Sequence, residues 1–456
     1  MKNHVRLRCI QGGRTFFVSM MNMYTPSRYN VIVNRNDLRY VWNTLSGAVA
    51  VLDDNTLEML SCGVNKISTC ETTQELIKNH ILVSSDFDEY GYVLSRANNT
   101  LVEQSPSDLH FVIAPTLRCN YHCEYCFEMG RTSFSDMTEP VISAIPQFVE
   151  RRMDGNSNLK CLHVNWFGGE PLLGLNFVER LSTRLITLCR SRNIAYRGTL
   201  ITNGRYLDEK TAEILSQIGI KRIQISIDGT EDSYCRSKRA TKDDYLSTIS
   251  NIAAAVRKGL PVVLRVNIRG NDFTSAYQLA DLFFGEMSLS SKVKLYLAFV
   301  NEGDVKRRKE SYAGFVEGEK NFVHYVYNKY SEGSYYNKLS FARGVSCSLS
   351  CLNNYCIGPE GELYKCEHHF GRKEYIVGSI FSKGMGSGCF SQEYDRIIYA
   401  SMRKEKCKWC KVFPICLGGC PNSNRLGEVG FDCKSYIEYL IECQMRRIRY
   451  EEERTK

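Results

Sequence analysis

Between about residue 110 and residue 300, short apolar runs alternate with longer amphipathic stretches. The short runs have the length of strands, and the longer stretches place apolar residues at helical spacing. The predicted strands are Phe111–Ala114, Leu162–Phe167, Thr199–Thr202, Arg222–Ile227, Val262–Ile268 and Lys294–Val300. The predicted helices between them are Thr138–Met153, Leu175–Ser191, Asp208–Ile218, Tyr245–Lys258 and Thr274–Met287. Six βα units in series predict an α/β fold, a partial (β/α)6 TIM-like barrel over residues 106–300, with chemistry at the carboxyl ends of its strands.

The regions on either side of this barrel have different patterns. Residues 1–105 contain short strand patterns and helical patterns, followed by a polar stretch at 84–99 that we interpret as a linker; we expect a small α+β domain with its own core. The patterns are Thr15–Ser19, Tyr29–Val33, Asn55–Leu60 and Thr72–Asn79. Residues 301–340 form a charged connection with one helix, Val316–Lys329, and residues 341–456 are rich in glycine, turns and cysteine.

Composition narrows the class of protein. The chain has 456 residues, 24% of them charged, and a net charge of +9, which is mild for this size and predicts no nucleic-acid partner. No apolar run approaches the ~20 residues that cross a bilayer, and the first residues lack the apolar core of a secretory signal. We therefore expect a cytoplasmic protein without a membrane partner. In a reducing compartment, its 20 cysteines indicate metal ligation or redox chemistry.

The first cysteine cluster directly follows the first barrel strand. It consists of Cys119, Cys123 and Cys126, with a C-x3-C-x2-C spacing. Three thiolates on one loop can hold three irons of a [4Fe–4S] cluster and leave the fourth iron open. A structural zinc site would need a fourth ligand, for which His122 is the local candidate. We expect His122 instead to be a solvent-facing spacer.

This run resembles the motif of the radical S-adenosylmethionine (radical SAM) superfamily, with Tyr125 in its aromatic position. Further elements at successive strand ends also match the family. The resemblance implies SAM as a cofactor, with the methionine ammonium received by Glu170 and nearby backbone carbonyls, and the ribose and carboxylate held after the fourth strand. The implied contacts are Tyr125, Gly168, Gly169, Glu170, Thr202, Asn203, Ser226, Asp228, Arg265 and Asn267. The family's arginine after the fourth strand is not assigned, because Arg236, Lys238 and Arg239 all lie near its place.

The carboxyl-terminal cysteines resemble the SPASM auxiliary-cluster domain, which implies two further [4Fe–4S] clusters. By that resemblance the first cluster would be held by Cys347, Cys351, Cys366 and Cys420, and the second by Cys407, Cys410, Cys416 and Cys433. Cys356 competes with Cys351 as a ligand. A zinc ribbon is the alternative for the C-x2-C pair at Cys407 and Cys410. The remaining cysteines, Cys161 among them, are interpreted as buried small hydrophobes.

In the radical SAM family, reductive cleavage of SAM produces a 5′-deoxyadenosyl radical that removes a hydrogen atom from the substrate. SPASM enzymes mostly modify peptides, so two activities compete. One is the cross-linking of a ribosomally synthesised precursor peptide, through a thioether or carbon–carbon bond. The other is the oxidation of Cys or Ser to formylglycine by an anaerobic sulfatase maturase. Those maturases have a catalytic aspartate where this chain has Glu367, so Glu367 is our candidate base. The alternative is a solvated carboxylate paired with His368, His369 or Arg372.

Residues 1–105 favour the first activity, because peptide maturases often begin with a winged-helix-like domain that recognises the leader of the precursor. The alternative for this region is a purely structural extension. The family also implies a flavodoxin- or ferredoxin-like electron donor. A different class of function, a multi-cluster electron-transfer protein without SAM chemistry, would need a fourth ligand for the first cluster and would have no use for Gly168–Pro171.

Overall fold

The computed structural model describes residues 8–11, 14–17, 24–35, 38–62, 71–102, 107–131, 133–289, 291–300, 305–330, 349, 354–382, 402–420, 422, 433 and 437–445. The chain forms two compact units. The N-terminal unit comprises Met1–Asn99, Phe341–Arg343 and Tyr399–Cys420. The larger unit, which we call the barrel unit after the predicted fold, comprises Thr100–Ser340, Gly344–Ile398 and Pro421–Lys456. Within the described ranges, no helix is long and apolar enough to span a membrane.

The barrel unit is built on a nine-stranded sheet in the order β13-β12-β11-β10-β9-β8-β14-β15-β16. Its first six strands in the chain are parallel to their neighbours, which confirms the predicted α/β fold with a mostly parallel central sheet. These strands are β8 (Asp108–Ile113), β9 (Cys161–Trp166), β10 (Ala195–Thr202), β11 (Ile220–Ser226), β12 (Val262–Ile268) and β13 (Val293–Phe299). All six lie within one or a few residues of the predicted ranges.

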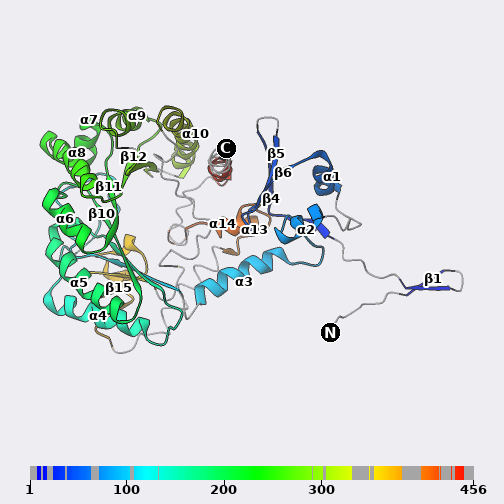
Figure 1. The fold of residues 1–456 in the computed structure, drawn as a ribbon, viewed down its shortest axis with the longest axis horizontal. Helices are drawn as coiled ribbons and strands as arrows, with labels where there is room; N and C mark the ends of the chain where they lie inside the picture. Colours follow the sequence, from blue (N-terminus) through cyan, green and yellow to red (C-terminus); the bar gives the residue numbers. More distant parts are fainter. Residues whose placement is uncertain are drawn as a thin grey trace. The chain divides into compact units, whose positions relative to one another are not determined.

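Helices cover one face of this sheet (Figure 1). They are α4 (Glu139–Met153), η1 (Pro171–Gly174), α5 (Leu175–Ser191), α6 (Glu209–Gln217), α7 (Glu231–Lys238), α8 (Lys242–Arg257), α9 (Thr274–Ala280) and η2 (Asp281–Glu286). The alternation along β8 directs Leu109, Phe111 and Ile113 into the core, where Phe111 meets Phe148 of α4 edge to face. All five predicted helices are confirmed; α7 was not predicted.

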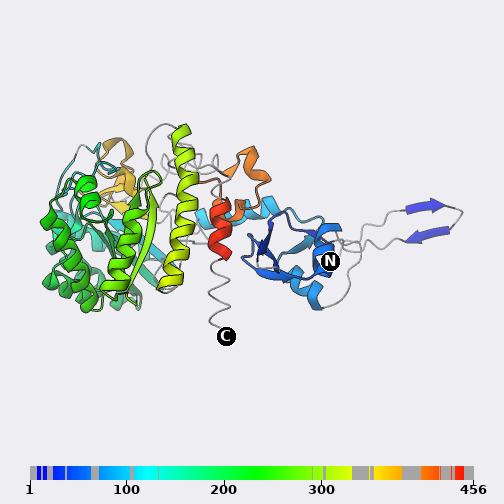
Figure 2. The ribbon, with the colours of Figure 1, turned by 90° about the horizontal axis from the view of Figure 1, so that it is seen from above.

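The following helix, α10 (Val305–Lys329), begins earlier than the predicted Val316–Lys329. Figure 2 shows it running alongside the barrel. Its Phe322 packs against Tyr277 of α9, and its Tyr325 donates a hydrogen bond of 2.5 Å to Asp281. Charged residues obscure the apolar stripe in the first half of this helix, and this explains why the sequence pattern shows only its second half.

Three short strands from the cysteine-rich region extend the barrel sheet. They are β14 (Tyr355–Ile357), β15 (Glu362–Tyr364) and β16 (Gly378–Ser379), with the short helices η5 (Glu367–His369) and η6 (Lys373–Tyr375) between the last two. Strand β14 pairs in parallel with β8, on the side of β8 opposite β9. The 341–456 stretch, which the sequence suggests as one domain, is thus shared between the two compact units: part of it completes the sheet edge of the barrel, and Tyr399–Cys420 belongs to the N-terminal unit.

The N-terminal unit contains a three-stranded antiparallel sheet, β4-β5-β6, and two small antiparallel pairs, β1-β2 and β3-β7. Its core consists of Val41, Leu52, Leu60, Leu76, Ile81 and Leu82. Its strands are β1 (Arg8–Gln11), β2 (Arg14–Phe17), β3 (Tyr24–Pro26), β4 (Asn30–Arg35), β5 (Leu38–Asn43), β6 (Val49–Leu52) and β7 (Leu82–Ser84). Its helices are α1 (Asp54–Cys62), α2 (Glu71–Lys78) and the greater part of α3 (Glu89–Val102), together with α13 (Glu405–Lys408) and α14 (Phe413–Cys416).

The interpretation of residues 84–99 as a linker is wrong, because α3 begins at Glu89. Glu89, Val93 and Ala97 are buried at four-residue intervals, so the buried face of this helix contains few apolar residues and starts with a carboxylate. That carboxylate accepts hydrogen bonds from the Ser27 hydroxyl and, at 2.9 Å, from the Arg28 backbone N–H. The burial of Glu89 is therefore balanced by hydrogen bonds from the chain just before β4.

Candidate functional site at the carboxyl edge of the barrel

The loop after β8 holds three half-buried cysteines, Cys119, Cys123 and Cys126. The Cys126 backbone N–H donates to the Cys123 carbonyl at 3.1 Å, and the Glu124 N–H donates to the carbonyl of Ser237 in α7 at 3.2 Å. Burial raises the pKa of the Cys119 thiol to about 12 and raises the pKa values of the other two thiols as well. A metal that binds here must therefore displace the protons of these thiols.

The spacing of these cysteines suits a multi-iron cluster. Ligands of a cubane bind different irons, so their sulfur atoms lie farther apart than the ligands of a single ion. Within the described ranges, the Cys loop contributes no set of three donor atoms close enough to bind one ion. His122 is exposed, as expected for a spacer. The chemistry of the donor set therefore fits a [4Fe–4S] cluster better than a mononuclear zinc site.

The end of β9 lies directly against this loop. A Cβ atom on Gly168, whose φ is +112°, would stand 2.5 Å from the Thr116 carbonyl oxygen. A Cβ atom on Gly169 would collide with the backbone carbonyl of Arg118. The Gly169 N–H donates to the Thr116 carbonyl at 3.1 Å. Only glycine allows the two backbones to approach so closely, one residue before the first cysteine.

Glu170 joins the ends of β9 and β10. Its side chain accepts hydrogen bonds from the Thr202 hydroxyl at 2.7 Å, the Asn203 N–H at 2.8 Å and the Leu172 N–H at 3.0 Å. The residue is only 1% exposed, and this burial raises the pKa of its carboxyl group. A carboxylate can accept about four hydrogen bonds, so one position stays available to a ligand. The Asn203 amide in turn donates to Asn120 of the Cys loop at 2.8 Å.

Asp228, after β11, is the centre of a second network. Its carboxylate accepts hydrogen bonds from Asn267 of β12 at 2.7 Å, from Ser237 at 3.1 Å and from the Tyr125 hydroxyl. The Lys238 ammonium lies 3.3 Å from the same carboxylate and also donates to the Tyr125 hydroxyl at 3.3 Å. The network thus ties the Cys loop, through Tyr125, to the ends of β11, β12 and α7.

Lys238 is fully buried beside Asp228. Burial alone would lower its pKa, but the carboxylate raises the pKa of Lys238 well above its ordinary value, so the side chain is a cation. Of the three basic candidates near this position, the structure brings Lys238 into the site, while Arg239 takes the left-handed conformation that ends α7. Sequence spacing alone could not select among them, because the choice depends on which face of α7 is buried.

The other predicted contacts lie on the same edge of the sheet. Arg265 of β12 donates to the Asn267 side-chain oxygen at 3.0 Å. Ser226 ends β11 in register with Arg265. The structure therefore brings all ten predicted cofactor contacts to the carboxyl ends of β8 to β12, as expected from their positions after the strands.

An aromatic stack that the sequence did not reveal connects the Cys loop to η5. Phe127 stacks on His368, with ring centroids 3.8 Å apart, and on Phe167, with centroids 6.1 Å apart. Arg372 donates to the Phe127 carbonyl at 3.2 Å. The only available signal was an aromatic residue directly after Cys126 and another after β9, which is common in apolar cores.

Glu367 is half-buried at the start of η5, and its carboxylate forms no hydrogen bond or ion pair with any described residue. The residues proposed as alternative partners are engaged elsewhere. His369 bonds to Asn422 at 2.8 Å, and His368 and Arg372 contact Phe127. The alternative of a paired carboxylate is therefore wrong for the described part of the chain.

The structure describes six of the eight cysteines that are predicted to bind the auxiliary clusters. Cys366 precedes η5, and the half-buried Cys407, Cys410 and Cys416 lie on or beside α13 and α14. Cys420 and Cys433 are also described, whereas Cys347 and Cys351 lie outside the described residues. Cys356 is fully buried in an apolar cluster with Ala114, Leu117, Tyr364 and Phe370, which is the environment of a structural cysteine.

Comparison with known proteins places this site in a family. Residues 113–283 match the model of the radical SAM superfamily. The chain is 24% identical to a cysteine-type anaerobic sulfatase-maturating enzyme of Clostridium perfringens, over 71% of this chain and 92% of that protein. It is 22% identical to a serine-type anaerobic sulfatase-maturating enzyme of Klebsiella aerogenes, over 70% of this chain and 81% of that protein.

Two solved structures share the fold. Native anSMEcpe with bound AdoMet aligns with a TM-score of 0.58 at 20% identity, over 76% of this chain and 99% of that one. Streptococcus suis SuiB bound to its precursor peptide SuiA aligns with a TM-score of 0.52 at 14% identity, over 88% of this chain and 97% of that one. The family match, the parallel sheet and the cysteine loop at its carboxyl edge together identify residues 113–283 as a radical SAM domain.

Proposed function

We propose that this protein is a radical SAM maturase that abstracts hydrogen from a ribosomally synthesised precursor peptide and installs a thioether or carbon–carbon cross-link. The observation that carries the radical SAM part is the loop of Cys119, Cys123 and Cys126, held against Gly169 and Glu170. The three thiolates would hold a [4Fe–4S] cluster. When bound, that cluster with SAM supplies a 5′-deoxyadenosyl radical for hydrogen abstraction.

The residues around this loop would bind and orient SAM. Glu170 retains one free acceptor position for the methionine ammonium, beside backbone carbonyls that Gly168 and Gly169 allow to come close. Ser226 and Asp228, in the segment after β11, would help to hold the ribose and carboxylate of SAM, with Arg265 and Asn267 of β12 as further contacts. Because Lys238 neutralises Asp228, the site can stay dry without an uncompensated charge.

The N-terminal unit supports a peptide substrate. The sulfatase-maturating relative aligns with 71% of this chain, whereas the SuiB structure, which contains a precursor peptide, aligns with 88%. Among the described strands, β4 and β6 are the edge strands of the β4-β5-β6 sheet. Ile32 of β4 and Val51 of β6 are exposed apolar residues on these strands, at 45% and 54%. We infer that a leader segment adds as a strand to one of these edges, in a winged-helix-like recognition domain.

The same unit contains Cys407, Cys410 and Cys416, three of the four cysteines predicted to bind the second auxiliary cluster. Tyr90 of α3 packs against Phe413 of α14 and donates to the Met402 carbonyl at 3.3 Å, and Arg28 lies over the Trp409 ring. A SPASM-type arrangement would hold two further [4Fe–4S] clusters, with Cys347, Cys351, Cys366 and Cys420 for one and Cys407, Cys410, Cys416 and Cys433 for the other. These clusters would accept the electron left after substrate oxidation or position the peptide, and a flavodoxin- or ferredoxin-like donor would supply the electron that cleaves SAM.

Glu367 would act as the general base. Formation of a cross-link requires loss of a proton as well as a hydrogen atom, and a base must be free to accept it. The carboxylate of Glu367 has no partner among the described residues, and its neighbour His368 stacks on Phe127, directly after Cys126. The contact between this short helix and the residue after Cys126 supports Glu367 as the base.

A second candidate is an anaerobic sulfatase maturase, which the two sulfatase-maturating relatives favour. One experiment separates the candidates. Reduced, reconstituted protein is incubated with SAM and either a sulfatase-derived peptide or the product of a neighbouring short reading frame, and products are analysed by mass spectrometry. A cross-link removes two hydrogens per link and leaves no aldehyde, whereas formylglycine adds a reactive aldehyde. An absence of 5′-deoxyadenosine in every reaction would favour the electron-transfer alternative.

A further inference from the structure

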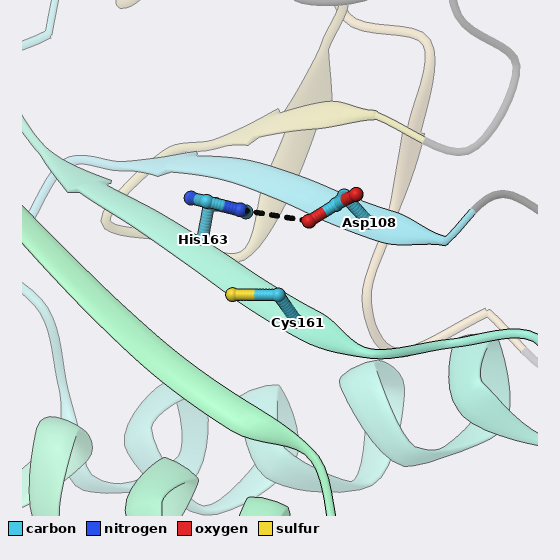
Figure 3. Close-up of side chains that lie close together, drawn as sticks. All are labelled: Asp108, Cys161 and His163. Carbon is cyan, nitrogen blue, oxygen red and sulfur yellow. Dashed lines mark hydrogen bonds and ion pairs between the residues drawn. The ribbon is translucent and has the colours of Figure 1, made fainter.

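The amino ends of β8 and β9 bring together a thiol, an imidazole and a carboxylate. In the parallel register of these strands, Asp108 lies opposite Cys161, and His110 lies opposite His163. Figure 3 shows the side chains of Asp108 and His163 projecting from the sheet face opposite the helices, with Cys161 beside them. One donor atom from each of Asp108, Cys161 and His163 lies within 4.8 Å of the other two.

We propose that these three side chains bind one zinc ion, with a water molecule as the fourth ligand. A thiolate, an imidazole and a carboxylate are the donors that zinc accepts in proteins, and three protein ligands with one open position are typical of zinc sites that bind water. This set lies at the opposite end of β8 from the Cys loop. It is therefore independent of the iron–sulfur cluster and of SAM.

A small movement of the side chains would bring the ligand atoms to the separations of a tetrahedral zinc site. The His163 Nε2 and Asp108 Oδ1 atoms are 3.0 Å apart. Zinc bonds of about 2.0–2.1 Å to nitrogen and oxygen separate neighbouring ligand atoms by roughly 3.3 Å in a tetrahedron. An ion can thus replace the hydrogen bond between these two groups. Cys161 would release its thiol proton to solvent as the ion binds.

Neighbouring groups hold the ligands in orientation. The Ser107 hydroxyl donates to the other carboxylate oxygen of Asp108 at 2.6 Å, which leaves Oδ1 for the ion. The His163 ring stacks on His110, with centroids 4.4 Å apart and an interplanar angle of 10°. Hydrogen bonds and packing of this kind fix the direction of metal ligands and raise affinity.

The group of Asp108, Cys161 and His163 has one buried side and one side exposed to solvent. Cys161 is buried, whereas the side chains of His163 and Asp108 are 25% and 38% exposed. Zinc and a water ligand can therefore enter from the side of His163. A bound ion would cross-link the first two strands of the barrel, and β8 is the strand that carries the Cys loop.

The test uses the full chain, reconstituted anaerobically with iron and sulfide, freed of loosely bound metal with a chelator and then titrated with Zn²⁺. We expect one zinc per chain to survive desalting in the wild type, in addition to its iron. The variants Cys161→Ser and His163→Ala should lose this zinc and keep their iron. The matched controls Cys235→Ser, in α7, and His80→Ala, in the N-terminal unit, should retain both metals. X-ray absorption at the zinc edge should show one sulfur ligand among nitrogen and oxygen ligands.

Two results would overturn the proposal. The first is equal zinc binding by the wild type and both variants, which would mean that Asp108 and His163 form a plain ion pair. The second is zinc coordinated by sulfur alone, which would place the ion at the auxiliary cysteines. If Cys161→Ser does not fold, and therefore does not bind its iron, the variant Asp108→Asn tests the proposal instead. This variant keeps the shape of the side chain and should weaken zinc binding by at least about tenfold.

Discussion

The Lys238 ammonium and the Asp228 carboxylate lie 3.3 Å apart, and each side chain is only 2% exposed. A buried ion pair is a weak source of stability by itself, but the loss of one partner leaves an uncompensated buried charge. Here the carboxylate also holds Tyr125 of the Cys loop and Asn267 of β12. The pair therefore positions the loop that carries the proposed cluster ligands.

Replacing Lys238 should damage both folding and SAM cleavage. We expect Lys238→Met to lower the free energy of unfolding by about 3–5 kcal/mol, because Asp228 is left buried without its positively charged partner. The measurements are denaturant unfolding and 5′-deoxyadenosine formation. The control is Lys242→Met, whose side chain is 66% exposed and should cost at most about 1 kcal/mol. Equal effects of the two substitutions would show that the buried pair does not position the site.

Gly169 should tolerate no side chain. In Gly169→Ala, the new methyl group would collide with the Arg118 carbonyl, one residue before Cys119, so the two loops would have to separate. We expect a loss of SAM cleavage of at least about a hundredfold, since small displacements of reacting groups can have effects of this size. Gly130→Ala is the matched control, because its methyl group would meet only the end of the Arg372 side chain, at 3.5 Å. A fully active Gly169→Ala protein would contradict the close approach.

Cys119, Cys123 and Cys126 should bind one of the three predicted [4Fe–4S] clusters. With three [4Fe–4S] clusters, the reconstituted chain should bind about twelve irons. Replacement of Cys119, Cys123 and Cys126 by Ala should remove about four irons and all 5′-deoxyadenosine formation. Cys235→Ala, on α7, should change neither quantity. A wild type that binds only four irons and several zinc ions would refute the auxiliary clusters while leaving the first cluster in place.

The sequence pattern predicts the barrel well because its elements are long and strongly periodic. β12 (Val262–Ile268) and α5 (Leu175–Ser191) have the predicted bounds. α3 was missed because its buried positions include Glu89 and a small Ala97 in place of large apolar residues. Lys238 could not be distinguished from its basic neighbours, and the pairing of Cys161 with Asp108 depends on strand register. Contacts between distant segments follow from packing, which local periodicity does not specify. For the group of Asp108, Cys161 and His163, the sequence signal was the pair of alternating patterns Asp-x-His at 108–110 and Cys-x-His at 161–163.

Strand addition at the N-terminal sheet should be sensitive to charge at its exposed apolar positions. We expect Ile32→Glu or Val51→Glu, on the two edge strands, to weaken precursor binding by about tenfold or more while SAM cleavage without substrate stays unchanged. Binding is measured by fluorescence anisotropy with a labelled leader peptide. Leu246→Glu, at an exposed apolar position on α8, is the control. Point variants are preferable to deletion of residues 1–100, because a deletion would also remove Tyr90, which packs against Phe413 on the same short helix as Cys416.

The last prediction concerns Glu367 and the kind of product. Glu367→Gln keeps the shape of the side chain but replaces the carboxylate, which can accept a proton, with an amide, which cannot act as a base. Since this carboxylate has no partner among the described residues, the substitution should leave folding, iron content and 5′-deoxyadenosine formation unchanged. It should slow formation of the cross-linked peptide by at least about tenfold, because a general base typically contributes about 10²–10⁴-fold.

The control is Glu360→Gln, which replaces an exposed carboxylate in the turn before β15 and should be fully active. Mass spectrometry distinguishes the outcomes: a product lighter by two hydrogens per link supports a cross-link, and an aldehyde supports a sulfatase maturase. Unchanged coupling in Glu367→Gln would exclude Glu367 as the base without affecting the assignment of the radical SAM domain.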